Sequence, residues 1–199
     1  MNLPNKLSVL RICLVPVFVI VMMLPETLFR GFDVFGSIIG VTIFIIASLT
    51  DMLDGKIARK YNLITDFGKF IDPLADKFMV IGALLVILYK YENIRPVFIW
   101  ATIIVIFREL AVTSIRLVAS SSSGIVIAAN YLGKIKTCTQ IACICTVIIE
   151  PLIYKIDALE FLAKYMPLSY LTTALMIVFT LWSGINYIVS YWKYLDPEK

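Results

Sequence analysis

Four aspartates between residues 51 and 76 have the spacing expected of a metal-binding site. Asp51 and Asp54 stand three residues apart, and Asp72 and Asp76 stand four apart. Both spacings place two side chains on one face of a helix. Four carboxylates brought close together repel one another unless cations separate them, and ligands that are all oxygen suit Mg²⁺ or Mn²⁺. The pattern therefore predicts a divalent-cation site to which two helices each contribute two carboxylates.

Two glycines and an arginine accompany these aspartates. Because glycine has no side chain, Gly55 and Gly68 leave room for a nucleotide between the two helices. Arg59 supplies a fixed positive charge for a phosphate. The alternative is that the aspartates are solvated charges at a membrane surface, neutralised by neighbouring basic residues. Ionisable residues within membrane segments are costly and usually mark a functional site, which favours the first interpretation.

The chain contains no histidine. This excludes a histidine nucleophile or base, so any proton acceptor must be Asp, Glu, Lys, Tyr or Cys. The cysteines all lie in apolar runs without a CxxC spacing, and we expect them to be small core residues rather than disulfides or metal ligands. They are Cys13, Cys138, Cys143 and Cys145.

The composition predicts the setting in which the aspartates are held. Hydrophobic residues make up 60% of the 199-residue chain and charged residues only 16%. This is too apolar for a soluble domain of this size and indicates a helical bundle in a lipid bilayer. No polar tract is long enough to be a linker, so residues 1–199 are expected to form a single membrane domain.

Apolar runs predict an all-α, polytopic membrane protein with six transmembrane helices and a short N-terminal interfacial segment. A membrane helix needs about 20 residues. The third run is too short unless it extends backwards over Gly68, Asp72 and Asp76. Residues 120–124 are expected to form the loop between the fourth and fifth helices. The six apolar runs are 7–24, 34–50, 78–89, 96–118, 132–149 and a stretch within 165–192.

Basic residues are distributed unequally between the two ends of these helices. With both termini in the cytoplasm, most lysines and arginines fall on the cytoplasmic side, including Arg11 near the start of the first helix. Because cytoplasmic loops carry an excess of Lys and Arg, the distribution favours cytoplasmic termini.

The run from Asp51 to Asp76 reads DxxDGxxARx8GxxxDxxxD, and it resembles the signature of the CDP-alcohol phosphatidyltransferase family at every fixed position. The resemblance implies a six-helix fold, a homodimer and an active site open to the cytoplasm. It also implies that the four aspartates bind two divalent cations, and that Asp76 accepts a proton. The residues implied to contact the CDP-lipid are Asn5, Gly55, Arg59, Thr65 and Gly68.

Other stretches bear on the acceptor alcohol. The opening NLPNKLSVLRICLVP, the REL and SIR triplets of residues 108–116, and GKIKT followed by Gln140 resemble bacterial phosphatidylglycerophosphate synthases, a branch of that family. This resemblance implies CDP-diacylglycerol and glycerol 3-phosphate as substrates. It further implies a protein of the bacterial inner (plasma) membrane, in contact with membrane lipids and without a nucleic-acid partner.

Glycerol 3-phosphate is a dianion and needs a basic pocket. Arg116, Lys134 and Lys136 flank one predicted cytoplasmic loop, and Arg108 stands two turns before Arg116 on the same face. These four residues are predicted to bind the acceptor phosphate. Alternatively, the two lysines merely follow the positive-inside rule, and Arg108 forms an internal ion pair with the adjacent Glu109.

Two other functions stay open at this point. The first is a family member that uses a different acceptor, such as inositol phosphate, serine or a second lipid. The second is a small cation transporter whose carboxylates bind ions in transit. The glycines and Arg59 argue against the transporter, because a cation path gains nothing from a buried arginine.

Overall fold

The computed structural model describes residues 1–24, 32–61, 65–123, 131–155 and 157–192. Over these residues the chain forms six α-helices and a short 3-10 helix, without a strand. The elements are α1 (Leu3–Met23), α2 (Phe32–Lys60), α3 (Asp66–Lys90), α4 (Arg95–Ser123), α5 (Tyr131–Ile153), η2 (Asp157–Leu162) and α6 (Pro167–Tyr191).

Local sequence explains where the helices near the aspartates begin. Asn2 caps α1 by accepting a hydrogen bond from the backbone nitrogen of Asn5 at 3.2 Å. Thr65 caps α3 in the same way, with its hydroxyl oxygen 3.0 Å from the backbone nitrogen of Gly68. Side-chain oxygens at these positions satisfy amide groups that have no partner inside the helix. The cap at Thr65 makes α3 start before Gly68, as the extended third run predicts.

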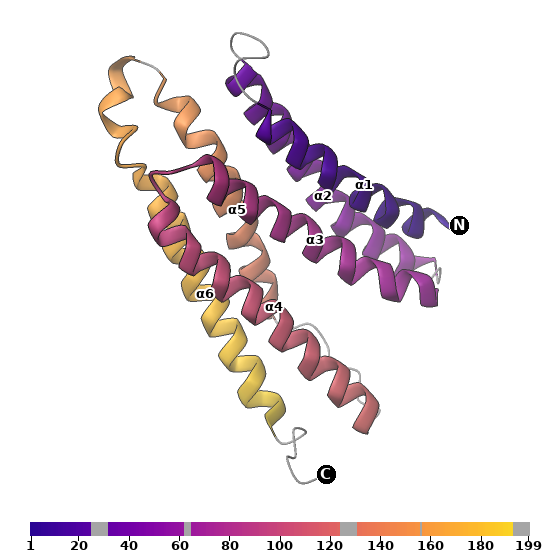
Figure 1. Cartoon of the computed structure of the whole chain (residues 1–199). Coiled ribbons are helices and arrows are strands. Elements are labelled where there is room, and N and C mark those ends of the chain that lie inside the picture. Colours follow the sequence, from indigo (N-terminus) through magenta and orange to yellow (C-terminus); the bar gives the residue numbers. More distant parts are fainter. Residues whose placement is uncertain (25–31, 62–64, 124–130, 156, 193–199) are drawn as a thin grey trace.

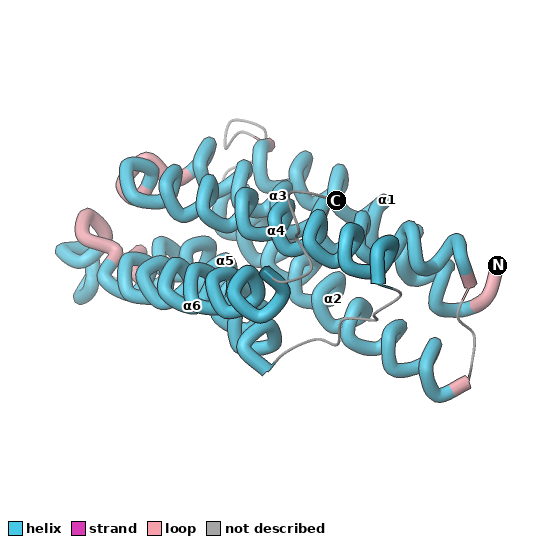
Figure 2. The backbone as a smooth tube through the Cα atoms, turned by 90° about the horizontal axis from the view of Figure 1, so that it is seen from below, coloured by secondary structure: helices cyan, strands magenta, loops and turns pink. Residues whose placement is uncertain are grey.

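The helices form two groups that pack along their length. In the first group α1 packs against α2 and α3, and in the second α6 packs against α4 and α5 (Figure 1). Contacts of α3 with α4, and of α2 with α5, join the groups. Seen from below in Figure 2, the helices run lengthwise side by side with their connections at the two ends. This arrangement brings α2, α3, α4 and α5 around a common interior.

A single apolar core contains residues from all six α-helices. Phe18, Phe44, Phe98, Ile144 and Met176 within it are fully buried. Many large apolar side chains are instead exposed on the outside, which a soluble monomer would avoid but a lipid-facing surface requires. The chain is therefore a multi-pass helical membrane protein.

Within the described residues, five helical segments are long and apolar enough to cross a membrane. The exception among the six is α3, which is long enough but carries several charged residues in its first half. The number of six transmembrane helices therefore stays a prediction, which depends on whether α3 crosses the membrane. The N-terminal segment expected at the interface is the start of α1. The five apolar segments are Leu3–Met23, Val34–Gly55, Arg95–Val118, Tyr131–Ile153 and Glu160–Tyr191.

Two local predictions need correction. Residues 120–123 belong to α4 rather than to a loop, because serine is tolerated in a helix and no glycine or proline interrupts these four residues; residue 124 lies outside the described residues. The second helix continues beyond the apolar run to Lys60, so Asp51 and Asp54 lie on this helix, as their spacing predicts. Among the cysteines, only Cys143 is fully buried and Cys145 is half-buried, whereas the other two are exposed.

Glu150 is a buried carboxylate with a structural role. It accepts hydrogen bonds from the hydroxyl of Tyr154 at 2.7 Å, from the backbone nitrogens of Leu168 and Ser169 at 2.9 and 2.6 Å, and from the Ser169 hydroxyl. The two backbone nitrogens belong to the first turn of α6, where amides otherwise lack partners and negative charge is favoured. Glu150 therefore fixes the start of α6 to the end of α5.

Candidate active site

Three polar side chains of α1 contact the elements that carry the aspartates. Asn5, Ser8 and Arg11 follow one another at three-residue intervals, share a helix face and are all buried. The amide nitrogen of Asn5 donates to Thr65 Oγ1 at 2.9 Å. The hydroxyl of Ser8 donates to Asp72 Oδ1. Through these contacts α1 holds the N-terminal half of α3.

Arg11 binds both aspartates of α2. Its Nη1 lies 2.6 Å from Asp51 Oδ1, and its Nη2 pairs with Asp54 Oδ2. The side chains of Arg11 and Asp54 are 1% and 5% exposed, whereas that of Asp51 is 41% exposed. A buried guanidinium is tolerated between helices only when carboxylates of this kind neutralise it. One open edge of the site therefore lies at Asp51.

The aspartates of α2 and α3 face a shared region. Asp54 is repelled electrostatically by Asp51 and by Asp72. Asp76 is repelled by Asp51 and attracted by Lys136 of α5. The one-sided spacing of each pair, together with the packing of both helices on α1, produces this arrangement. A region with this much negative charge attracts cations.

A small cavity of about 20 Å³ opens beside Asp76, large enough for a water-sized group. Gln140 Nε2 in its wall is buried and has no hydrogen-bond partner among the residues described. The cavity is thus lined by the carboxylate of Asp76 on α3 and by the ammonium group of Lys136 and the amide nitrogen of Gln140 on α5. Its lining consists of Asp76, Lys77, Val80 and Ile81 of α3, Glu109 of α4, and Lys136, Thr137 and Gln140 of α5.

Glu109 is the centre of a buried charge cluster at this cavity. It forms ion pairs with Lys136 and, at 3.1 Å, with Arg108. Arg108 also donates to Ser183 Oγ on α6 at 2.8 Å. A side chain at Gly184 would lie 3.1 Å from Arg108 Cγ, so glycine allows this close approach. Arg108 therefore forms an internal ion pair with Glu109, which is the alternative that the sequence left open to binding of the acceptor phosphate by Arg108.

The other two predicted acceptor residues lie nearer the helix ends. Arg116 Nε donates to the hydroxyl of Tyr187 at 2.9 Å, and its guanidinium carbon lies 5.1 Å from the centre of that ring. Lys134 is exposed near the start of α5. Of the four residues predicted to bind the acceptor phosphate, Lys136 is the one that lines the cavity beside Asp76.

The side of Gly68 on which a side chain would stand faces Asn5 and Thr65 rather than an open space. A methyl group placed there would lie 2.8 Å from Asn5 Oδ1 and 3.2 Å from Thr65 Oγ1. The absence of a side chain at Gly68 thus allows α1 to approach α3. Gly55 is half-buried directly after Asp54 in α2. The side chain of Arg59 lies outside the described residues, although its backbone continues α2.

Gly68→Ala is expected to lower the stability of the protein by about 1–3 kcal/mol, because the added methyl group overpacks the contact between α1 and α3. Gly133→Ala is the matched control, since no atom of the described residues lies within 4 Å of its Cβ position. Alanine should there stabilise α5 by up to about 1 kcal/mol. Thermal unfolding of both variants in detergent micelles measures the difference. Equal melting temperatures for the two variants would contradict the packing argument.

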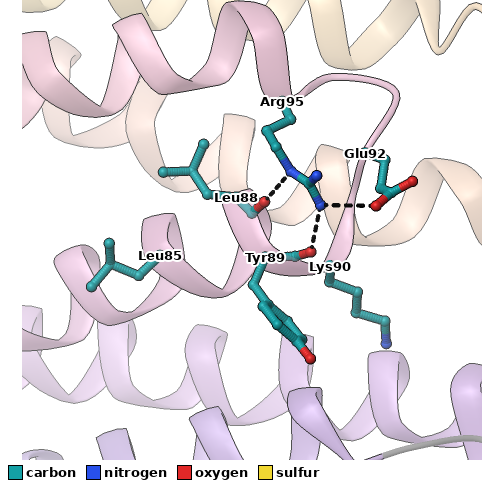
Figure 3. Close-up of a pocket in the computed structure, with 6 residues that line it drawn as sticks. All are labelled: Leu85, Leu88, Tyr89, Lys90, Glu92 and Arg95. Atoms are coloured by element: carbon teal, nitrogen blue, oxygen red, sulfur yellow. Dashed lines mark hydrogen bonds and ion pairs between the residues drawn. The ribbon is translucent and has the colours of Figure 1, made fainter.

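A larger hollow of about 810 Å³ lies at the other end of α3, about 20 Å along the helix from Asp76. Figure 3 shows that Arg95 turns back onto the end of α3. Its Nε and Nη2 donate to the backbone oxygens of Leu88 and Tyr89 at 2.8 and 2.9 Å, and Glu92 pairs with it at 3.3 Å. These contacts cap the helix, and the hollow contains none of the aspartates.

Sequence patterns did not reveal the roles of Ser8, Arg11 and Gln140, and they suggested Glu109 only as an ion-pair partner of Arg108. Charge distribution predicts only that Arg11 helps to orient the chain, whereas its side chain is buried against two aspartates. The available signal was the polar spacing of Asn5, Ser8 and Arg11 within an otherwise apolar helix. That spacing predicts a polar face, but it does not say which helix that face meets.

The donor set fits a hard divalent cation. Four carboxylates supply only oxygen ligands, which is what Mg²⁺ and Mn²⁺ prefer. Over the described part of the chain, no three acidic, histidine or cysteine side chains converge closely enough to bind one ion. Two of the four carboxylates are bound by Arg11 instead. Cation binding therefore requires these side chains to change partner.

The helical membrane bundle contains paired aspartates, a buried guanidinium and a cavity lined by a lysine. Ionisable groups within membrane helices are typical of a membrane-embedded enzyme rather than of a passive anchor. The model of the CDP-alcohol phosphatidyltransferase family matches residues 1–191, and the chain belongs to this family.

Several curated relatives share one name, CDP-diacylglycerol–glycerol-3-phosphate 3-phosphatidyltransferase. The relative from Bacillus subtilis (strain 168) is 40% identical over 99% of this chain and 98% of its own length. The relative from Shigella flexneri serotype 5b (strain 8401) is 30% identical over 94% and 93%. The relative from Rickettsia felis is 35% identical over 70% of each chain. The chain is similar to these transferases over most of its length.

Proposed function

We propose that this protein transfers the phosphatidyl group of CDP-diacylglycerol to sn-glycerol 3-phosphate, giving phosphatidylglycerol phosphate and CMP. The observation that carries this proposal is the cavity lined by both the carboxylate of Asp76 on α3 and the ammonium group of Lys136 on α5. The full-length similarity to relatives named for this reaction supports the choice of substrates.

The chemical step is a displacement at phosphorus. A hydroxyl oxygen of glycerol 3-phosphate bonds to the phosphorus of the phosphatidyl group, and the bond from that phosphorus to the CMP oxygen breaks. Asp76 takes the proton of the attacking hydroxyl group. The cavity beside Asp76 is where that hydroxyl group would lie, because carboxylate and hydroxyl must come within about 3 Å.

Lys136 and its neighbours hold the acceptor. An ammonium group beside Asp76 attracts a phosphate dianion and keeps its hydroxyl group near the base. Gln140 adds a buried donor that has no partner in the described part of the chain and can bind an oxygen of the acceptor. Arg116 and Lys134, nearer the helix ends, would attract the dianion towards the site. The residues proposed to hold the CDP-lipid are Asn5, Gly55, Arg59, Thr65 and Gly68.

Two divalent cations, Mg²⁺ or Mn²⁺, are proposed to bind to the four aspartates Asp51, Asp54, Asp72 and Asp76. Such cations neutralise the pyrophosphate of the CDP-lipid and the negative charge that develops on CMP. The protein's contribution is to place two carboxylates on one face of α2 and two on one face of α3, and to hold both helices against α1. The contacts from α1 to Asp51, Asp54 and Asp72 provide that restraint.

The decisive experiment measures CMP release by the purified protein in micelles with CDP-diacylglycerol and Mg²⁺ or Mn²⁺. Release that requires glycerol 3-phosphate, and that neither serine nor inositol phosphate supports, is the expected result. Release with another alcohol would keep the family chemistry and change the acceptor. Absence of release with every alcohol, together with uptake of cations into vesicles, would favour the transporter.

Lys136→Ala is expected to raise the KM for glycerol 3-phosphate about 10- to 100-fold, because it removes one charge-assisted phosphate contact. The KM for CDP-diacylglycerol should change by less than about threefold. Lys134→Ala is the matched control on the same helix, and its exposed position predicts a smaller effect. Steady-state kinetics with each substrate varied in turn makes the comparison. Equal changes for both substrates would place Lys136 outside the acceptor pocket.

We further propose a homodimer in a bacterial plasma membrane with the aspartates near the cytoplasmic face. Family resemblance supports the dimer, and the excess of basic residues near the aspartate end supports the orientation. Molar mass measurement in detergent tests the dimer. Labelling of a Lys134→Cys variant without the native cysteines, in inside-out and right-side-out vesicles, tests the orientation, because Lys134 is exposed near the start of α5.

A further inference from the structure

We infer that Arg11 is the internal counter-ion of Asp51 and Asp54, and that it competes directly with a divalent cation for these two carboxylates. This inference rests on the proposed function, because it takes the four aspartates to be the cation site. It assigns a positioning role to a side chain of α1, which contributes no carboxylate of its own.

The hydrogen-bond geometry of Arg11 suits a partner that can be displaced. Its two terminal nitrogens bind two different carboxylates, so neither aspartate has the paired, fork-like contact that makes arginine–carboxylate pairs strong. Arg11 Nε is buried and has no partner among the described residues. A buried donor without a partner calls for an explanation, and exchange of the guanidinium between partners supplies one.

The charges explain why a counter-ion is needed here. Asp54 is almost fully buried, and the negative charges of Asp51 and Asp72 both repel it. Without a cation these carboxylates would destabilise the packing of α2 on α3. The guanidinium offsets one of their charges. A divalent cation offsets two, so it can replace the guanidinium once it is available.

Release of Arg11 does not require α1 to leave the bundle. Asn5 still bonds to Thr65, and Ser8 still bonds to Asp72. Val15, Phe18 and Met22 bury the rest of the helix in the core. The exchange is therefore a movement of one side chain, and α1 keeps the aspartates of α3 in place throughout.

Competition predicts that removing the guanidinium strengthens cation binding. Arg11→Met keeps an unbranched side chain of similar reach and removes the charge. At an effective dielectric constant near 20, a unit charge held a few ångströms from a divalent ion would change its affinity by more than about 10³-fold, but the displaced guanidinium avoids most of this repulsion by moving away from the ion. The variant should therefore bind Mn²⁺ about 10- to 100-fold more tightly. Without metal its melting temperature should fall, and Mn²⁺ should raise it more than in the wild type.

The experiment titrates full-length protein in micelles with Mn²⁺, without substrate, and measures free Mn²⁺ by electron paramagnetic resonance. Arg95→Met is the matched control, since Arg95 caps α3 at the opposite end and contacts no aspartate of the site. Its Mn²⁺ affinity should equal that of the wild type. The lysine of Arg11→Lys keeps the positive charge but can contact only one of the two carboxylates. The Mn²⁺ affinity of this variant should therefore lie between those of the wild type and Arg11→Met.

The outcomes separate this inference from the proposed function. If the wild type binds Mn²⁺ and Arg11→Met binds it equally or more weakly, Arg11 is not a competitor although the cation site stands. If the wild type binds no Mn²⁺, both the cation site and the competition are overturned. Should Arg11→Met fail to fold, Arg11→Lys decides alone, and an affinity no higher than that of the wild type refutes the inference.

Discussion

Asp76→Asn is expected to leave CDP-diacylglycerol binding largely intact while reducing turnover about 10²- to 10⁴-fold, the usual effect of removing a general base. Asparagine keeps an oxygen ligand and almost the same volume, so CDP-lipid affinity should fall only severalfold. It cannot accept the proton of the attacking hydroxyl group. The chain contains no histidine that could replace it near neutral pH.

The measurement for Asp76 pairs CDP-lipid affinity with single-turnover CMP release in the same preparation. Glu92→Gln removes a carboxylate at the far end of α3, where Glu92 pairs with Arg95, and should leave both quantities unchanged. If affinity and turnover of Asp76→Asn fell by the same factor, Asp76 would be a ligand only. Glu109, which lines the same cavity, would then be the next carboxylate to test as the base.

Asp54→Asn is expected to abolish turnover and to weaken Mn²⁺ binding at least about tenfold, because cation binding depends on the charge of the carboxylate. The protein should still fold, since the new amide oxygen can accept a hydrogen bond from Arg11 and the apolar core is untouched. A loss of stability of about 1–3 kcal/mol is expected, because Arg11 then keeps only one full counter-charge.

Metal removal provides the comparison for Asp54. Wild-type protein treated with a chelator should lose turnover and recover it when Mg²⁺ or Mn²⁺ is restored, whereas Asp54→Asn should not recover at ordinary concentrations. CMP release and thermal unfolding of the same samples separate lost chemistry from lost fold. Near-normal turnover of a folded Asp54→Asn enzyme would remove Asp54 from the cation site.

The sequence by itself determined the class of fold and the composition of the site. Apolar runs of the right length predict membrane helices because a bilayer core accepts no other continuous backbone except a closed barrel. Spacings of three and four residues put Asp51 with Asp54, and Asp72 with Asp76, on single helix faces, because those spacings are close to one turn. Both inferences depend only on local geometry, which the length of a run and the spacing of residues along the chain determine.

Tertiary structure alone decided which side chains meet these faces. Arg11 stands 40 residues before Asp51 in the chain, and their contact depends on how α1 is rotated and shifted against α2. The same packing fills the space at Gly68 with Asn5, and it turns Arg108 towards Glu109 and Ser183. No spacing within a helix predicts such contacts, because helix rotation and offset are fixed by the packing of the whole bundle.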